Sequence, residues 1–185
     1  AGLSRGAGGL LILEGEEGSG RSRLLAVAGD AARASAIPVH GVRVTRPDGP
    51  TGVLLRLLDS VRKLAPPDEA ASLEAAAQGA ADSPGGTARA QLFRTLAMTV
   101  ARISRDGPQV ILVDDAHEAL LPAIDGLLAL ARALATERVL IVLAMDGSVR
   151  TPRLDAMRAL GSRVVVGSLG EPDAVSLAAS LLGAG

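Results

Sequence analysis

The stretch Gly15-Glu16-Glu17-Gly18-Ser19-Gly20-Arg21-Ser22 follows an apolar run at residues 10–13 and opens a helical pattern. It matches the phosphate-binding pattern G-x-x-x-x-G-K-[ST], except that Arg21 replaces the lysine. Glycines let the backbone curl so that N–H groups point at phosphate oxygens, and the helix start adds its positive dipole end. The basic side chain reaches the outer phosphates, and the Ser22 hydroxyl can ligate Mg²⁺. The stretch predicts a phosphate-binding turn; a glycine-rich turn without a ligand is the plainer alternative.

A second motif, Val110-Ile111-Leu112-Val113-Asp114-Asp115, consists of four apolar residues followed by two acids. An acid at the C-terminal end of a parallel strand lies at the ligand-binding edge of the sheet. We expect this strand to neighbour the strand before the glycine-rich turn. We further expect Asp114 to hold Mg²⁺ together with Ser22, and Asp115 to polarise an attacking water as the catalytic residue. An Asp-Asp cap of the following helix is the alternative.

Strand-like and helical segments alternate along the rest of the chain. Strands are predicted at residues 10–13, 39–44, 109–113, 138–144 and 163–166, and helices at residues 23–36, 52–65, 89–105, 119–135, 152–160 and 172–182. Residues 66–88, with their prolines and glycines, predict a mobile loop with room for one short helix. The alternation predicts an α/β fold of about five mainly parallel strands with helices on both faces. Together with the phosphate-binding pattern at residues 15–22, it predicts the three-layer sandwich of a P-loop NTPase.

Composition narrows the class of protein. The 185 residues carry 19 basic and 20 acidic side chains, one phenylalanine and no cysteine. This excludes disulfides, cysteine metal sites and a base-stacking platform, and it leaves no electrostatic footprint for nucleic acid. The longest apolar run, residues 139–145, is far shorter than the ~20 residues of a membrane span. We therefore expect one cytoplasmic domain, with no membrane contact and no direct nucleic-acid binding.

The two motifs, with the apolar segment "RVLIVLAMDGS", resemble the ATPase domain of the STAND branch of the AAA+ superfamily. The similarity extends to the large ATP-binding LuxR-family transcriptional regulators of actinobacteria, on the strength of Asp114-Asp115-Ala116-His117. The resemblance covers residues 10–182. It implies an ATP-dependent switch that binds ATP or ADP with Mg²⁺. It also implies that residues 1–185 form one module of a larger regulator, whose other domains are its partners.

The resemblance also defines a site and its departures from the family. The cofactor-binding set runs from Gly15 through Ser22 to Arg23, although Arg23 is better explained as a solvated helix residue. Asp146 stands where family members often carry a polar or arginine sensor, and an acid there would repel a γ-phosphate. His117, two residues past the acid pair, is a candidate reporter of the nucleotide state or a helix-start residue. His40, within a strand, is expected to be structural.

Four functions follow as hypotheses. The leading one is a regulatory switch domain that binds ATP and hydrolyses it weakly with Mg²⁺. The second is a degenerate scaffold or assembly module, in which Arg21 and Asp146 reduce hydrolysis and a near-zero net charge permits self-association. The third is a small-molecule kinase that uses residues 66–88 as a lid. The last is a plain structural α/β domain.

Overall fold

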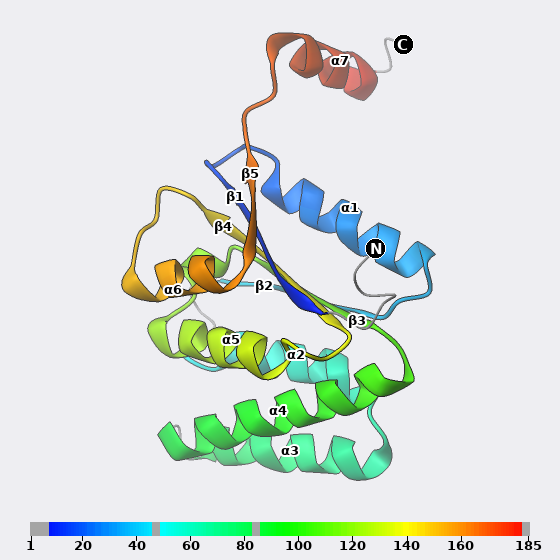
Figure 1. Cartoon of the computed structure of the whole chain (residues 1–185), viewed down its shortest axis with the longest axis vertical. Helices are drawn as coiled ribbons and strands as arrows, with labels where there is room; N and C mark the ends of the chain where they lie inside the picture. Colours follow the sequence, from blue (N-terminus) through cyan, green and yellow to red (C-terminus); the bar gives the residue numbers. More distant parts are fainter. Residues whose placement is uncertain (1–7, 46–48, 83–85, 183–185) are drawn as a thin grey trace.

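A five-stranded sheet forms the centre of the chain (Figure 1). The computed structural model describes residues 8–45, 49–82 and 86–182. Its strands are β1 (Gly9–Gly15), β2 (Val39–Arg43), β3 (Gln109–Asp114), β4 (Val139–Asp146) and β5 (Ser162–Val166). They lie in the order β2-β3-β4-β1-β5, and each pair of neighbours is parallel. The predicted five-stranded, mainly parallel sheet is confirmed.

The strand order places β4 between β1 and β3. The expectation that the two motif-bearing strands are neighbours is therefore wrong. Both β1 and β4 are apolar and buried on both faces, so their sequence pattern does not reveal which strand β3 pairs with. The two motifs still meet, because parallel strands all end at the same edge of the sheet. At that edge Gly15 of β1 pairs in register with Asp146 of β4, and Arg43 of β2 pairs with Asp114 of β3.

Helices cover the two faces of the sheet unequally (Figure 1). Helix α1 lies on one face, and α2, α4, α5 and α6 lie on the other, with α3 packed outside α2 and α4. The helices are α1 (Arg21–Ala34), α2 (Gly52–Arg62), α3 (Pro67–Asp82), α4 (Gly86–Asp106), α5 (Leu121–Ala133), α6 (Pro152–Leu160) and α7 (Glu171–Leu182), and a 3-10 turn η3 spans Ala116–Glu118. One face of the sheet therefore has a thin cover and the other a thick one.

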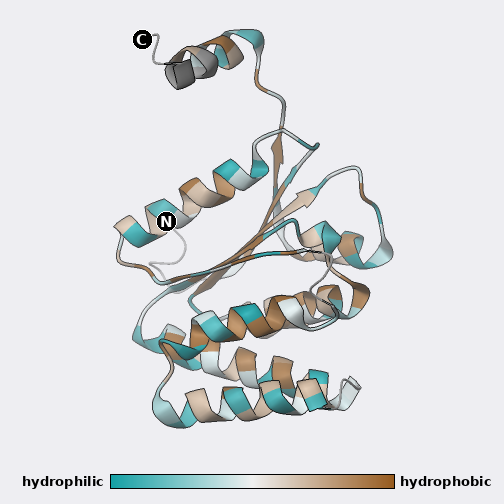
Figure 2. Ribbon diagram, turned by 180° about the vertical axis from the view of Figure 1, so that it is seen from behind, coloured by the Kyte–Doolittle hydropathy of each residue, from teal (hydrophilic) through white to brown (hydrophobic). Residues whose placement is uncertain are grey.

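Alternation along the strands explains how the sheet fills both layers. In β3, Ile111 and Val113 join the large cluster under the thick cover, whereas Val110 and Leu112 join the small cluster beneath α1. Successive side chains of a strand point to opposite faces, so each central strand contributes to both cores. Figure 2 shows apolar and hydrophilic segments alternating along the helices.

The prediction of a mobile loop at residues 66–88 is wrong, because α3 fills most of that range with 16 helical residues. Pro67 stands at the first helical position, where proline is tolerated, and Asp68 and Glu69 complement the helix dipole. Leu73, Ala76 and Ala80 recur at helical spacing and are buried. The prolines and glycines near the two ends of the helix obscured this periodicity in the sequence. Residues 83–85 of the predicted loop lie outside the described residues.

Two other helical predictions differ in detail. The helix expected at residues 119–135 is shortened to α5, because Leu120 is extended before Pro122 in the first turn of that helix. The 3-10 turn η3 precedes the predicted range. The predicted helix at residues 172–182 corresponds to α7, which projects from the sheet beyond β5 (Figure 1). Within the described parts of the chain, no helix has the length and apolar character needed to cross a bilayer.

Candidate functional site

The turn between β1 and α1 has the backbone that the phosphate-binding pattern predicts. Gly18 and Gly20 have positive φ angles of 80° and 92°, which glycine adopts without steric cost. At Gly15 an added Cβ would lie 2.4 Å from Ser19 Oγ and 2.5 Å from the Val166 carbonyl oxygen. Gly20 is the N-cap of α1 and supplies no side-chain cap, so the first N–H groups of the helix remain available to an anion.

Two buried polar atoms of this turn have no hydrogen-bond partner among the described residues. They are Ser19 Oγ and Arg21 Nη1, and Arg21 as a whole is only 8% exposed. Buried polar groups are nearly always hydrogen-bonded, so these two atoms indicate a polar group that the turn is shaped to receive. A phosphate offers acceptor oxygens to both. The residues present therefore fit a phosphate-bearing cofactor.

The two sequence motifs are in direct contact. Ser22 Oγ donates a hydrogen bond of 3.0 Å to Asp114 Oδ1, across 92 positions of sequence. The same carboxylate oxygen accepts a bond of 3.1 Å from the Asp115 backbone N–H. A hydroxyl and a carboxylate oxygen at this separation are the hard oxygen donors that Mg²⁺ prefers. The pair expected to hold the metal is thus assembled at the end of β3, although β4 separates the two strands.

Asp115 is held by an arginine that the sequence analysis did not single out. Arg43 Nε donates a hydrogen bond of 2.9 Å to Asp115 Oδ2 and lies 3.7 Å from Asp114 Oδ2. Asp115 itself has a positive φ of 53°, which is uncommon outside glycine. Arg43 ends β2, so its position at the same sheet edge as the two acids was the signal that could have revealed it. The expected catalytic carboxylate is therefore part of an ion pair.

Arg21 faces a carboxylate as well. Its Nη2 lies 3.9 Å from Asp146 Oδ2, at the end of β4. On its other side, Asp146 Oδ1 accepts hydrogen bonds of 2.7 Å from the Ser148 backbone N–H and 2.6 Å from Ser148 Oγ. These bonds, chiefly that from the Ser148 side chain, hold the pKa of Asp146 below its ordinary value. The basic residue of the turn thus points toward a fixed negative charge.

His117 links the second motif to β4. Its Nδ1 accepts a hydrogen bond of 3.2 Å from the Asp146 backbone N–H, and its Nε2 lies 3.8 Å from Glu118 Oε1. The ring is therefore positioned beside the Arg21–Asp146 pair. Its role as a reporter of nucleotide state remains a prediction.

Two hollows flank the glycine-rich turn. One, of about 430 Å³, lies on the β3 side and is lined by charged residues that include Arg21, Arg43, Asp115 and Asp146. The other, of about 750 Å³, lies on the β5 side and includes the apolar side chains of Val165, Val166 and Leu169. Glu17 and Gly18 line both hollows. The turn therefore separates a charged compartment from a more apolar one.

The structure assembles most of the predicted site residues but not all of them. Residues 15–22 form the turn, and Asp114 and Asp115 meet it at the sheet edge. Glu16 and Glu17 are exposed, as expected for a turn that binds through its backbone. Arg23 is exposed on α1 and lines neither hollow. Its side chain fits the solvated alternative better than the cofactor-binding one.

Some of the polar groups buried beneath the site were not predicted from the sequence. Glu14 and Arg158 are both 6% exposed and form an ion pair below the turn. Neither residue is among those predicted from the sequence to belong to the site. His40, expected to be structural, is buried in β2, where Nδ1 lies 2.9 Å from Ser60 Oγ and Nε2 lies 3.2 Å from Gln109 Oε1.

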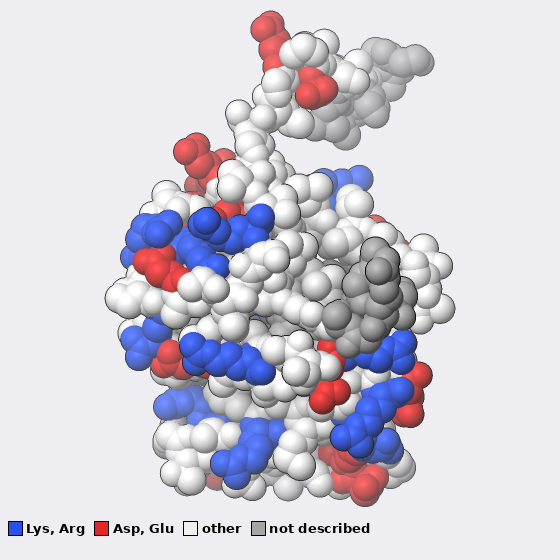
Figure 3. All heavy atoms as spheres, viewed as in Figure 1, with Lys and Arg blue, Asp and Glu red and all other residues white. Residues whose placement is uncertain are grey.

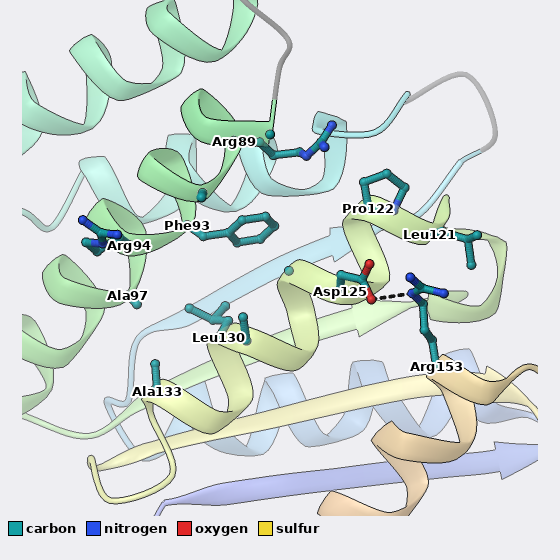
Figure 4. A pocket seen from close by; sticks show the side chains of 14 residues that line it. Arg89, Phe93, Arg94, Ala97, Leu121, Pro122, Asp125, Leu130, Ala133 and Arg153 are labelled. Atoms are coloured by element: carbon teal, nitrogen blue, oxygen red, sulfur yellow. Dashed lines mark hydrogen bonds and ion pairs between the residues drawn. The ribbon is translucent and has the colours of Figure 1, made fainter.

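A third hollow lies away from the turn, between α4 and α5 (Figure 4). It has a volume of about 490 Å³ and a floor of small and apolar side chains, with Phe93 turned toward α5. Arg153 of α6 closes one end through its ion pair with Asp125. Figure 3 shows basic and acidic side chains interspersed over the face it draws.

Comparisons with known proteins agree on the fold. Three similar solved structures are a DNA replication initiation factor, the Orc1 protein of Aeropyrum pernix in complex with DNA, and a signal transduction ATPase with numerous domains (STAND) from Pyrococcus horikoshii with a tetratricopeptide repeat sensor. Their identities to this chain are 14%, 18% and 17%, with TM-scores of 0.57, 0.57 and 0.55. The alignments cover 98%, 96% and 96% of this chain. At these identities the similarity establishes the α/β P-loop NTPase fold.

The chain spans half or less of these structures, namely 47%, 45% and 24% of their lengths. No curated protein matches it. The family model described as "AAA ATPase domain" matches residues 1–143, which is more than half of the chain. The chain belongs to the AAA ATPase domain family.

Proposed function

We propose that this chain is the nucleotide-binding switch domain of a larger cytoplasmic regulator, and that it binds ATP or ADP with Mg²⁺. The observation that carries the proposal is the 3.0 Å contact between Ser22 Oγ and Asp114 Oδ1. It joins the glycine-rich turn to the acidic strand end, next to Ser19 Oγ and Arg21 Nη1, which find no hydrogen-bond partner in the described part of the chain. A plain structural domain has no need to bury two unsatisfied polar atoms beside this contact.

Each residue then has a defined task. The backbone N–H groups of residues 15–22 and the start of α1 bind the phosphate oxygens, and Arg21 contacts a phosphate through its guanidinium. Ser22 and Asp114 hold Mg²⁺, which when bound neutralises charge on the phosphate chain. Asp115 orients and polarises the attacking water. To act on water, this carboxylate must leave Arg43, to which it is bonded at 2.9 Å, so we expect hydrolysis to be slow.

The larger regulator is inferred from the length of similar proteins. One of the similar structures is a signal transduction ATPase that combines this fold with a tetratricopeptide repeat sensor. We propose an equivalent arrangement here, in a regulator of the LuxR-type transcriptional class. Residues 1–185 would supply the nucleotide switch. Contacts with DNA would belong to other parts of the protein, and self-association or contact with those parts would transmit the switch.

Nucleotide affinity tests the proposal directly. ATP and ADP are titrated into the chain with and without Mg²⁺, followed by measurement of phosphate release. Ser22→Ala should weaken binding about tenfold in the presence of Mg²⁺ and much less in its absence, because it removes a metal ligand. Ser72→Ala is the matched control, since it removes an exposed hydroxyl from α3. Failure of both nucleotides to bind, even to Arg21→Lys, would exclude the proposed function.

A second candidate, the scaffold with little or no hydrolysis, is favoured by the ion pairs of Arg43 with Asp115 and of Arg21 with Asp146. Binding without phosphate release identifies it. If hydrolysis is detected, Asp115→Asn should slow it more than it weakens binding, and equal turnover in that variant would contradict the assigned role. The kinase hypothesis loses its proposed lid, because α3 occupies most of residues 66–88.

A further inference from the structure

The charged hollow beside the turn carries an excess of negative charge. Its acidic lining residues are Glu17, Asp115, Glu118 and Asp146, and its basic ones are Arg21 and Arg43. Four carboxylates thus face two guanidinium groups, a formal excess of two negative charges. Like charges brought together in a partly buried space repel one another. Each further negative charge on a ligand that enters this hollow is therefore opposed.

The two arginines of the hollow are already engaged with acids. Arg43 bonds to Asp115 at 2.9 Å, and Arg21 Nη2 lies 3.9 Å from Asp146 Oδ2. Of these two ion pairs, only that of Arg21 with Asp146 involves the turn residue that is expected to contact phosphate. Because Arg21 is buried, its guanidinium has few alternative directions.

Asp146 is the less mobile partner of the Arg21 pair. Both donors of Ser148 bond to its Oδ1, and its own backbone N–H donates to His117 Nδ1 at 3.2 Å. The next residue, Gly147, donates its N–H to the Gly15 carbonyl oxygen at 3.1 Å. These bonds tie the end of β4 to the end of β1. The negative charge is therefore fixed at the side of the turn.

Orientation of a nucleotide follows from the metal donors. The proposed donors Ser22 and Asp114 meet on the β3 side of the turn, and Mg²⁺ held there would neutralise charge on the outer phosphates of a triphosphate. The outermost phosphate would therefore enter the charged hollow, close to Arg21 and Asp146. A diphosphate would engage the turn but place less charge in that hollow.

We propose that Asp146 makes this a nucleoside-diphosphate-selective site, by holding a fixed carboxylate beside Arg21 where a third phosphate would need that guanidinium. This inference rests on the proposed nucleotide-binding function. In this chain, the arginine in place of lysine and the acid at the end of β4 form a matched pair. Arg21 and Asp146, the two departures from the family pattern, thus act together to determine whether the diphosphate or the triphosphate binds more tightly.

The test compares Mg·ADP and Mg·ATP affinities, measured by titration calorimetry on the full chain and on Asp146→Asn. Asparagine retains the oxygen that accepts both Ser148 bonds but removes the charge. The unmodified chain should bind ADP about tenfold more tightly than ATP, an effect of one unit charge at partly screened range. In Asp146→Asn the ratio should fall to about threefold or less, because ATP affinity rises while ADP affinity changes little.

Asp125→Asn is the control for the change in net charge, because its carboxylate pairs with Arg153 away from the turn. It should leave the ratio unchanged, and thermal melting should show that both variants are folded. Equal affinities for ADP and ATP in the unmodified chain, or an Asp146→Asn variant that retains the full ratio, would overturn the selectivity while leaving nucleotide binding intact. If neither ADP nor ATP binds to any variant, Arg21→Lys included, both the selectivity and the proposed function are overturned.

Discussion

Replacement of Arg158 by methionine should destabilise the fold strongly, because the change leaves a carboxylate buried without its partner. Arg158 forms an ion pair with Glu14, and both residues are 6% exposed. Its other guanidinium atoms donate to Asp155 Oδ1 at 2.9 Å and to the carbonyl oxygens of Asp146 and Val149 at 3.3 Å and 3.0 Å. One side chain therefore connects β1, the end of β4 and α6.

The magnitude follows from the desolvation of the remaining charge. Breaking a buried pair by removal of one partner typically costs about 3–5 kcal/mol, whereas apolar replacement of both partners is often neutral. The nearest other cation is Arg163, whose Nη1 lies 3.7 Å from Glu14 Oε2 and whose side chain is half exposed. It can replace only a small part of the lost interaction. Arg158→Met should thus cost about 3 kcal/mol or more, and the double variant Glu14→Leu/Arg158→Met should recover about 2 kcal/mol of it.

Urea unfolding followed by circular dichroism measures both changes as differences in the free energy of unfolding. Arg153→Met is the matched control, since it breaks an ion pair with Asp125 in which both side chains are about half exposed. Such surface pairs contribute at most about 1 kcal/mol. A loss below about 1 kcal/mol for Arg158→Met, or a double variant as unstable as the single one, would refute the assignment of this pair as a buried, coupled unit.

Three further predictions concern other parts of the chain. Gly126→Ala should destabilise the fold by about 1 kcal/mol in thermal melts, because overpacking against the single phenylalanine ring, 1.3 Å from the added Cβ, outweighs the helix-forming gain of alanine. Gly79→Ala, where the Cβ meets nothing within 4 Å, should instead stabilise by up to about 1 kcal/mol, and equal effects of the two changes would contradict this packing. Burial lowers the pKa of His40 below its ordinary 6.5, so the stabilisation from its neutral form is complete above that pH and is lost as the pH falls below it. His40→Gln should therefore reduce the slope of stability against pH just below about pH 6.5 by up to about 1.4 kcal/mol per pH unit, and an unchanged slope would exclude this titration. Arg43→Ala should free Asp115 and raise the rate of phosphate release from ATP, and a lower rate would show that the pair supports hydrolysis.

The turn and the central strands could be predicted because their sequence patterns are local. Residues 15–22 combine glycine spacing, a hydroxyl and a preceding apolar run within one segment. The sequence also predicted that Ser22 and Asp114 lie at the same edge of the sheet, since parallel strands end at one edge. The position of β4 between β1 and β3 could not be predicted from the sequence. These three strands are all apolar and look alike in sequence, and their order is decided by tertiary packing.

The ion-pair partners of the charged residues also could not be predicted from the sequence. Arg43 lies 72 positions from Asp115, and Arg158 lies 144 positions from Glu14. Nothing in either local sequence identifies the acid with which each of these arginines pairs. Residue types and their spacing indicate which side chains lie at the edge of the sheet. Which of these side chains pair with one another depends on packing between elements that are distant in sequence.

The unequal covering of the sheet determines which part of the domain opens most easily. Only Arg21, Leu25 and Gly29 are buried in α1, and among the described residues this is the one helix that covers its face of the sheet. Local unfolding is easiest where few apolar contacts are lost, so the backbone amides of α1 should exchange with deuterium before those of the central strands. The same helix begins at the phosphate-binding turn, and a ligand that binds only its folded form stabilises it by mass action. Nucleotide binding would then be measured as slower deuterium exchange of the backbone amides of α1.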